Sequence, residues 1–447
     1  MMNRKMSLRW FLFGLGAQLQ VLASLSLAEA FALCAAPLIF FKEWRYIKRD
    51  GLGTFFVLSL CLWANGAISC IANHSPMMFV VRGMAVLSLI ICAIIVGHWF
   101  LRQDMSGFKW YLVGDMLSNI LCTFVFQRSA EVTSFTGGAS NTVDITTMMS
   151  GPLFWISKVK SVAMLPLQGW YLDCPMAFCV GVPLGLAVFS LLISTSGRAA
   201  MLGFVGAGML ALIGGKRAAT IRAHVCQKFW LLVVVAILGV FTIKTVYQVS
   251  AVKGWLGEES RQKYERQTKG DNSLIGLLMG GRMESFCGLI ACVDKPIIGF
   301  GPWAMDDGYY TRTFLSKYAD EEDYKRFMEL ELFKQRCGIV DVSLIPCHSF
   351  ITEFWLWYGI FGLIFWLYVV YVLLRYLRQD CYAVPQMYMW LACGIPAYLW
   401  NVFFSPFGNR TGSILFIVAV LMVRAVRKRK LLLPPTMIAE AEGRRYV

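Results

Sequence analysis

Three residues in this sequence have the chemical types and local surroundings needed to bind phosphate and to move a proton. Arg198 follows a Ser-Thr-Ser-Gly run, and Arg282 follows two glycines at the start of an apolar-periodic stretch. An arginine at the start of a helix adds a fixed charge to free backbone N–H groups, which suits a phosphate, so two arginines suit a pyrophosphate. His348 immediately precedes a long apolar run, where an imidazole can take a proton from a hydroxyl near neutral pH.

Each of these residues also has a simpler interpretation. An arginine at a membrane boundary commonly anchors a span at the interface, which would account for Arg198. Arg282 can pair with Glu284, and an exposed pair of this kind has little energetic consequence. A lone histidine such as His348 can simply cap a helix. The local sequence around the three residues, rather than any one of them, favours the chemical role.

The elements that must position these residues are predicted to be membrane-spanning helices. Hydrophobic residues make up 57% of the chain and charged residues 15%, with a mean hydropathy of +0.59, whereas soluble domains are closer to a quarter charged. A helix needs roughly 20 mostly apolar residues to cross a bilayer. Runs near that length lie at residues 8–24, 26–41, 53–71, 77–101, 109–126, 176–193, 199–214, 229–249, 350–374, 387–404 and 412–426.

The distribution of charge predicts how these runs are oriented. The net charge is +15, yet the long segment 249–349 carries 13 basic and 15 acidic residues, so the excess lies elsewhere. Short basic loops face the cytoplasm, and long loops translocate largely regardless of charge. Segment 249–349 is therefore expected on the side of the membrane away from the cytoplasm. The basic tail is expected to lie at the lipid surface. We therefore predict no nucleic acid as a partner. The basic connections lie at residues 42–49, 102–109, 216–228, 375–378 and 424–430.

Keeping all five basic connections on one side requires a twelfth, weaker span within residues 146–172; the alternative is an interfacial helix there. We therefore predict an all-α polytopic membrane protein of about 12 transmembrane helices, with a large periplasmic helical loop between the spans at 229–249 and 350–374. The expected parts are N-terminal helices (1–175), a helical core (176–248), a periplasmic loop subdomain (249–349), C-terminal helices (350–426) and a cytoplasmic basic tail (427–447).

The cysteines predict no metal centre. Among the 14 cysteines there is no Cys-x-x-Cys pair and no Cys/His cluster with the spacing of a zinc site. Cys337 and Cys347 both fall in the predicted outer loop, where a disulfide and two free thiols are equally compatible with the sequence, since sequence alone does not fix the geometry.

The segment 347–363, Cys-His-Ser-Phe-Ile-Thr-Glu-Phe-Trp-Leu-Trp-Tyr-Gly-Ile-Phe-Gly-Leu, resembles a motif of the O-antigen ligase and polymerase superfamily of integral-membrane glycosyltransferases. In that motif a histidine opens a span and two glycines follow about three turns later. His348, Gly359 and Gly362 keep this spacing. Ser349 stands where asparagine is common, and Trp357 stands where glutamate is usual.

Two further segments are similar to elements of the same family. Ser194-Thr-Ser-Gly-Arg-Ala199 resembles its Ser/Thr/Gly-rich arginine motif. Gly281-Arg282 followed by a helix, Pro296 and Gly299-Phe-Gly301 resembles its Gly-Arg, helix, Pro, Gly-x-Gly element. The resemblance covers residues 181–365, and the span count and the loop position agree with the family outside that range.

The resemblance implies an inverting, metal-independent membrane glycosyltransferase of the GT-C type, without a cofactor, in the bacterial inner membrane with its active site facing the periplasm. The donor would be a glycan on undecaprenyl pyrophosphate, and the acceptor a sugar hydroxyl of lipid A–core. Arg198 and Arg282 would bind the pyrophosphate, and His348 would act as general base. Ser349 and Arg410 are assigned to substrate binding with them; for Arg410, an interfacial anchor is the alternative.

Two other functions stay open on the sequence. A polymerase would extend another lipid-linked glycan and would share these motifs, although one dominant outer loop favours a ligase. A transporter of lipid-linked glycans would require charged residues lining a cavity across many spans, and the apolar runs carry few. His74, His98 and His224 lie outside the motifs, so alanine is expected to be tolerated at all three.

Overall fold

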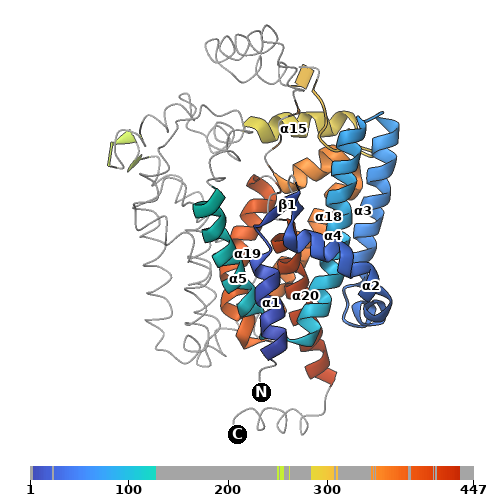
Figure 1. Ribbon diagram of the computed structural model, residues 1–447. Helices are drawn as coiled ribbons and strands as arrows, with labels where there is room; N and C mark the ends of the chain where they lie inside the picture. The colour runs from blue at the N-terminus through green and yellow to red at the C-terminus, as the bar shows by residue number, and fades with distance from the viewer. Residues whose placement is uncertain are drawn as a thin grey trace.

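The computed structural model describes residues 4–22, 25–126, 249–250, 252–255, 261, 283–306, 309–310, 344–345, 347, 349–380, 384–405, 407 and 410–432. This part of the chain is mostly helical, as predicted, and its long helices form one bundle (Figure 1). Helix α15 lies across one end of the bundle, and the start of α1 and the last turns of α20 lie at the other (Figure 1). The elements are α1 (Arg4–Leu15), β1 (Gln20–Leu22), β2 (Leu25–Ser26), α2 (Leu27–Arg49), α3 (Gly53–Ala72), α4 (Met77–Gln103), α5 (Phe108–Phe126), α15 (Met283–Asp294), α18 (Phe350–Arg375), the π-helical turn η2 (Tyr376–Asp380), α19 (Pro385–Phe404) and α20 (Arg410–Leu432).

Three of the described helices are long and apolar enough to cross a membrane. They are α3, α4, and α18 together with η2, and they coincide with the predicted runs 53–71, 77–101 and 350–374. Helices α5, α19 and α20 coincide with three further predicted runs. The predicted runs between residues 146 and 249 lie outside the described residues, so the total of 12 stays a prediction.

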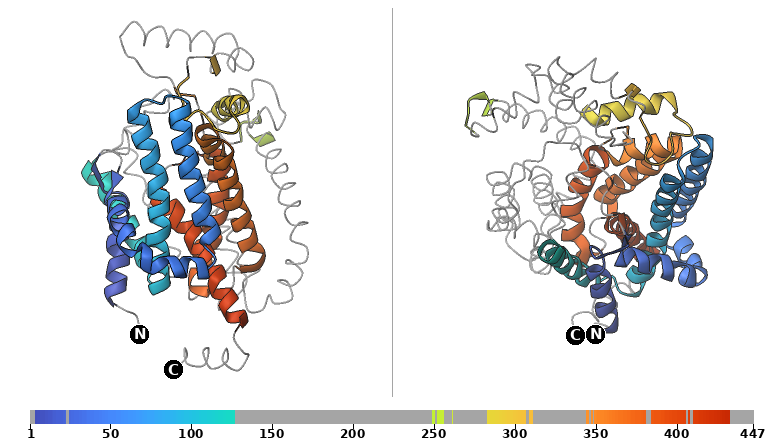
Figure 2. Two further views of the ribbon diagram at one scale, coloured as in Figure 1. Left: turned by 90° about the vertical axis from the view of Figure 1, so that its right-hand side faces the viewer. Right: turned by 45° about the horizontal axis from the view of Figure 1, so that its top comes forward.

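The first two predicted runs differ from the structure. Helix α1 has 12 residues, a length of about 18 Å, which is shorter than a bilayer core. The chain then forms the antiparallel pair β1–β2 before α2 begins. Ser26 and Glu29 form a capping box, in which each side chain accepts a hydrogen bond from the other residue's backbone N–H, and this fixes the start of α2. Helix α2 then lies across the ends of α3 and α4 (Figure 2).

Helix α1 is held by a close approach to α5. A Cβ on Gly14 would overlap the carbonyl of Tyr111, and one on Gly114 would overlap the carbonyl of Phe11. Small residues at such contacts let two helix backbones approach closely. The buried Trp10 Nε1–H donates a hydrogen bond to the carbonyl oxygen of Asp104 (3.0 Å), which fixes α1 against the turn before α5.

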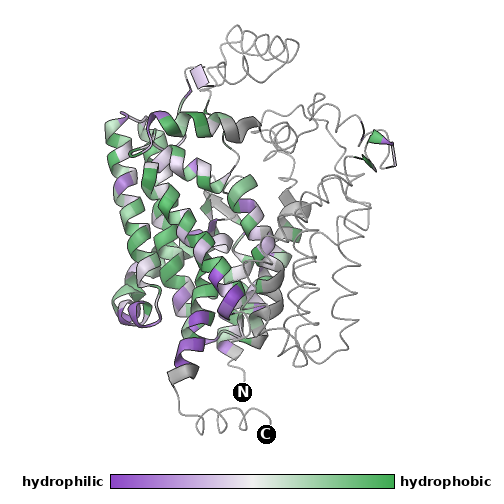
Figure 3. Cartoon of the chain, turned by 180° about the vertical axis from the view of Figure 1, so that it is seen from behind, coloured by the Kyte–Doolittle hydropathy of each residue, from purple (hydrophilic) through white to green (hydrophobic). Residues whose placement is uncertain are grey.

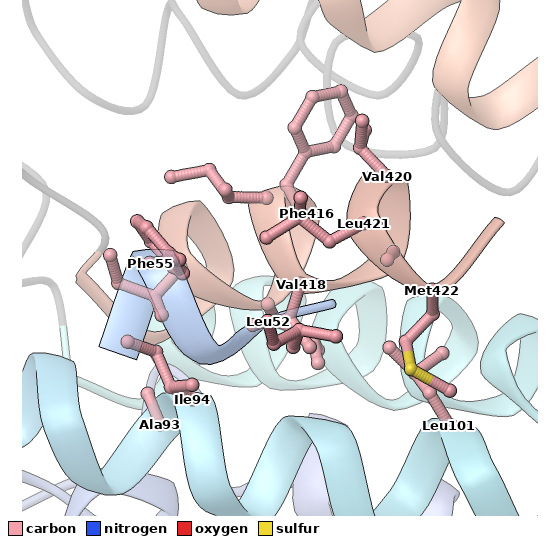
Figure 4. Close-up of a cluster of buried hydrophobic side chains, with 14 of the residues drawn as sticks. Leu52, Phe55, Ala93, Ile94, Leu101, Phe416, Val418, Val420, Leu421 and Met422 are labelled. Carbon is pink, nitrogen blue, oxygen red and sulfur yellow. The ribbon is translucent and has the colours of Figure 1, made fainter. Parts of the chain in front are cut away.

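The main apolar core lies where α4 packs against α20 and the start of α3. Side chains from the three segments meet in Figure 4, including Ile94 from α4, Phe55 from α3 and Val418 from α20. Away from this core the helices are hydrophobic along most of their length, and hydrophilic residues gather toward the end where the start of α1 and the last turns of α20 lie (Figure 3). We call this end the basic end, because α2, α4 and α20 each carry a basic residue at or near their C-terminal ends there: Lys48, Arg102 and Lys428.

A buried ionic cluster joins three helices at the basic end. His98 of α4 is fully buried, with Nδ1 at 2.9 Å from a carboxylate oxygen of Glu43 and Nε2 at 3.1 Å from one of Asp50. Arg102 donates two hydrogen bonds to Glu43, at 3.0 and 2.6 Å. Arg429 of α20 donates one to Asp50. Both ring nitrogens of His98 face carboxylate oxygens, which only accept hydrogen bonds when ionised, so the ring is an imidazolium.

The position of His98 overturns the expectation that alanine is tolerated there. Hydropathy placed this residue near the end of a span but gave no sign that two acids from α2 and its C-cap enclose it. We expect His98→Ala to lower the free energy of unfolding by about 3–5 kcal/mol, because it removes a buried positive charge and one hydrogen bond from each of two buried carboxylates. Thermal unfolding of the purified protein in detergent measures this. His74→Ala, at an exposed position, is the control and should cost less than about 1 kcal/mol.

The same cluster predicts a loss of stability in acid. Burial acts to raise the pKa of Asp50, but hydrogen bonds from His98 and Arg429 outweigh it and lower the pKa to about 2. The contribution of ionised Asp50 is therefore fully present above its unfolded pKa of about 4 and is lost as pH falls toward 2. Unfolding measured from pH 6 to pH 2 should show this loss in the wild type and a smaller one in Asp50→Asn. Equal acid sensitivity of the two proteins would contradict it.

Candidate functional site

The predicted catalytic residues Arg198, Arg282 and His348 lie outside the described residues. Their neighbours in sequence are described: α15 begins at Met283, directly after Arg282, and α18 has Ser349 as its N-cap, directly after His348. Helix α15 packs against α18 at the end of the bundle opposite the basic end (Figure 1). The structure therefore brings together the helices that follow two of the three predicted residues.

Several contacts fasten α15 and the segment before His348 to the first turns of α18. The Cys292 thiol of α15 donates a hydrogen bond to the carbonyl oxygen of Thr352 (3.7 Å). Ile345 N–H donates to the carbonyl oxygen of Ala304 (2.9 Å), so the chain leading to His348 pairs with the chain that follows α15. A buried apolar cluster fills the space between them, formed by Cys287, Ala291, Cys292, Ala304, Ile345 and Leu356.

The backbone of α18 is broken at Gly359, inside the resemblance motif. Gly359 has φ 60° and ψ −151°, a conformation that residues with a Cβ rarely adopt. The break frees carbonyl groups that a continuous helix would satisfy. Residues 297–301, which we call the docking segment, fill this gap: Phe300 N–H donates to Leu356 O (2.7 Å) and Gly301 N–H to Trp357 O (3.0 Å).

The docking segment fits only because glycines stand at the contact. A Cβ on Gly359 would overlap the carbonyl of Ile297, and one on Gly299 would lie 2.6 Å from Gly359 N. Gly299 and Gly301 also have positive φ, at 78° and 83°. The Gly299-x-Gly301 element and Gly359, which belong to separate motifs in the sequence, thus form the two sides of one contact.

Polar side chains of α3 and its C-cap complete the hydrogen bonding around the break. Asn65 Nδ2 donates to the carbonyl oxygen of Tyr358, and Ser69 Oγ donates to that of Trp357 (3.0 Å). Asn73 Nδ2 donates to the Gly299 carbonyl (3.0 Å) and its Oδ1 accepts from Lys295 Nζ (2.6 Å). Every carbonyl freed at residues 356–358 therefore has a donor.

Ser349 and Arg410, the two described members of the predicted site, lie at the same end of the bundle. The buried Ser349 Oγ accepts from Thr352 N–H (3.2 Å) and donates to the carbonyl oxygen of Val402 (3.2 Å) in α19. Its hydroxyl thus caps α18 and ties it to α19, and a contact with substrate stays a prediction. Arg410, half-buried, is the first residue of α20.

Glu353 was not predicted from the sequence as a site residue. It lies one turn inside α18 with 9% of its surface exposed, and its Oε2 accepts a hydrogen bond from Phe407 N–H (3.1 Å). The charge of Arg410 acts on it from the start of α20. A carboxylate inside an otherwise apolar run was the signal available in the sequence, because such residues are rare in spans and mark functional positions.

The open alternatives for Cys347 are settled by the structure in favour of a free thiol. Burial raises the pKa of this thiol well above its ordinary value, so it stays protonated and unreactive. Among the described residues, no group of three or more His, Cys, Asp and Glu side chains could hold a metal ion.

Comparison with known proteins gives no independent assignment: no protein-family model matches the chain, and no curated protein matches its sequence. The family resemblance therefore depends on the motifs quoted above and on the way the described ones fit together.

The contact at Gly359 can be tested with a matched pair of glycine variants. Gly359→Ala should prevent the docking segment from binding α18, because both the backbone conformation and the space exclude a Cβ. Gly51→Ala is the control, since Gly51 has φ 80° but no atom within 4 Å of where a Cβ would lie, so it reports the conformational cost alone, about 1–2 kcal/mol. Thermal unfolding should show a clearly larger loss for Gly359→Ala. Equal losses would mean that the docking contact contributes little.

Proposed function

We propose that this protein is a membrane glycosyltransferase of the O-antigen ligase type. It transfers a glycan from undecaprenyl pyrophosphate to a sugar hydroxyl of lipid A–core, at the periplasmic face of the bacterial inner membrane. The observation that carries the proposal is the contact between the docking segment and the Gly359 break. This contact joins two family-like motifs, and it sets the helix that follows Arg282 beside the helix that follows His348.

The proposed orientation follows from where the basic residues gather. Helices α2, α4 and α20 end with basic residues at one end of the bundle, and α15 with the first turn of α18 lies at the other. Short basic segments stay in the cytoplasm. The end that carries Ser349 and Arg410 would then face the periplasm, where lipid-linked glycans are presented.

In the proposed reaction, Arg198 and Arg282 bind the pyrophosphate and stabilise the charge it gains as it leaves. His348 removes the proton of the acceptor hydroxyl, whose oxygen attacks the anomeric carbon and displaces undecaprenyl pyrophosphate with inversion. Arg410 adds a positive charge at the same end of the bundle. No metal ion takes part in this scheme.

The direct test of this function is transfer by purified protein in liposomes containing the undecaprenyl-pyrophosphate glycan and one of two acceptors. Lipid A–core as the productive acceptor supports a ligase. Elongation of a second lipid-linked glycan instead would make the protein a polymerase, and movement of the glycan across the bilayer without transfer would make it a transporter.

The donor site predicts a specific sensitivity to arginine variants. Arg282→Lys keeps the charge but loses the planar fork that grips two phosphate oxygens, so transfer should fall by on the order of 100-fold or more. Arg198→Ala should have a similar effect, with normal amounts of protein in the membrane. Arg82→Lys, at an exposed position in α4, is the matched control and should retain activity. Near-normal transfer by the Arg282 variant would show that Arg282 does not bind the pyrophosphate.

The proposed role of His348 as general base predicts a loss of transfer in its alanine variant and a pH dependence of transfer in the wild type. His348→Ala should reduce transfer by on the order of 100- to 10,000-fold, because general-base catalysis typically contributes that much. In the wild type, activity should fall as pH drops below an imidazole pKa of about 6.5, where the base becomes protonated. Activity that rises on acidification would instead indicate an imidazolium that binds phosphate and would exclude the base role.

A further inference from the structure

The second half of helix α2, residues 38–49, exposes both large apolar side chains and positive charge. Helix α2 contains Pro37, and a proline inside a helix removes one backbone hydrogen bond and bends it. Beyond this proline Glu43 is buried, whereas Leu38 and Phe41 are 79% and 84% exposed. Four exposed basic residues lie on the same stretch: Lys42, Arg45, Lys48 and Arg49.

The exposed residues form two neighbouring rows along the helix. Phe41 and Trp44 are three residues apart, so they lie on one side. Lys42, Arg45 and Arg49 follow each other at intervals of three and four, so they form a second row. A helix of this kind lies in the plane of a membrane interface, with its apolar row among the acyl chains and its basic row at the headgroups.

The position of α2 in the bundle agrees with an interfacial location. Helix α2 is not one of the three described helices that are long and apolar enough to cross a membrane. It lies across the ends of α3 and α4 (Figure 2). The ring of Trp44 packs on that of Phe56 in α3, with 5.3 Å between centroids, so the apolar row of α2 continues onto a spanning helix.

The acids near this segment are already bonded to other basic groups. The carboxylates of Glu43 and Asp50 hold four such groups: His98, Arg102, Arg49 and Arg429. Lys42, Arg45 and Lys48 have no acidic partner within the part of the chain that the structure describes. The exposed surface of α2 therefore carries positive charge that the protein itself does not balance there.

Helix α20 adds to this charge from a distant part of the sequence. Arg429 donates a hydrogen bond to Asp50, the residue that follows α2, so the last turns of α20 lie beside the end of α2. Lys428 in those turns is also exposed, and no described acid pairs with it. Clusters of four or more basic residues on an amphipathic helix at a membrane surface attract anionic lipid headgroups.

We propose that the second half of α2, together with Lys428 of α20, is a binding site for anionic phospholipids in the leaflet at the basic end. The exposed basic side chains contact the headgroup phosphates, and Phe41 and Trp44 lie among the acyl chains. The inference does not rest on the proposed transferase function, because it concerns the end of the bundle opposite α15 (Figure 1).

The test titrates the purified full-length protein, in a neutral detergent, with phosphatidylglycerol or with phosphatidylcholine of the same chain length. Native mass spectrometry measures the bound lipid, and the wild type should bind phosphatidylglycerol more tightly. The variant Lys42→Gln/Arg45→Gln/Lys48→Gln should lower this preference, expressed as a ratio of Kd values, by on the order of tenfold or more, because each basic residue near an anionic surface contributes about fivefold. Added salt should weaken the wild-type preference.

A matched control removes the same positive charge from exposed residues outside α2, in the variant Arg82→Gln/Lys109→Gln/Lys253→Gln. It should keep the wild-type preference. Thermal unfolding without added lipid should be the same for all three proteins, since every changed side chain is exposed. An unchanged preference in the α2 variant, or an equal loss in the control, overturns the proposal.

The same spectra test whether a second copy of the chain covers this face instead. Under the proposal, Phe41→Ser leaves the oligomeric state of the protein unchanged, because Phe41 contacts lipid. A wild-type dimer that becomes monomeric in Phe41→Ser would make this face an interface between two copies and would overturn the lipid site.

Discussion

The break in α18 at Gly359 is the constraint on which the described architecture depends. A helix in an apolar environment must satisfy its own carbonyl groups, because an unpaired one costs several kcal/mol. Here the carbonyls of Leu356, Trp357 and Tyr358 are satisfied by groups from far along the chain. Hydrogen bonds to the backbone carbonyl groups of α18 therefore hold the docking segment and α3 in place, in addition to apolar packing.

This constraint explains the spacing of the glycines. Gly359 provides the positive φ at the break, and Gly299 leaves room for the docking segment to approach it. Trp303 then stacks on Trp357 at 4.9 Å, and Trp355 Nε1–H donates to Pro296 O (3.1 Å), so the contact extends on both sides. Because α15 directly precedes the docking segment, the break also determines where α15 lies.

The sequence predicted what depends on average hydropathy and missed what depends on single polar contacts. Helices α3, α4 and α18 could be predicted because length and apolar content suffice to define a span. The end of α1 at Leu15 could not, because the chain leaves the helix for the β1–β2 pair while the run is still apolar. The Gly299-x-Gly301 element and Gly359 were visible in the sequence, but their contact was not, because hydrogen bonds between distant segments leave no local pattern. The enclosure of His98 was missed for the same reason.

Buried acids have different sets of partners at the two ends of the bundle. At the basic end, Glu43 faces both His98 and Arg102 at hydrogen-bond distance, and His98 in turn is bonded to Asp50. Such complete pairing is what a structural cluster requires, since an uncompensated buried ion is costly. At the other end, Glu353 accepts one hydrogen bond from a backbone N–H among the described residues. A buried acid with so few partners stabilises a fold less than an apolar side chain of similar size would, so packing alone does not account for the place of Glu353 in α18.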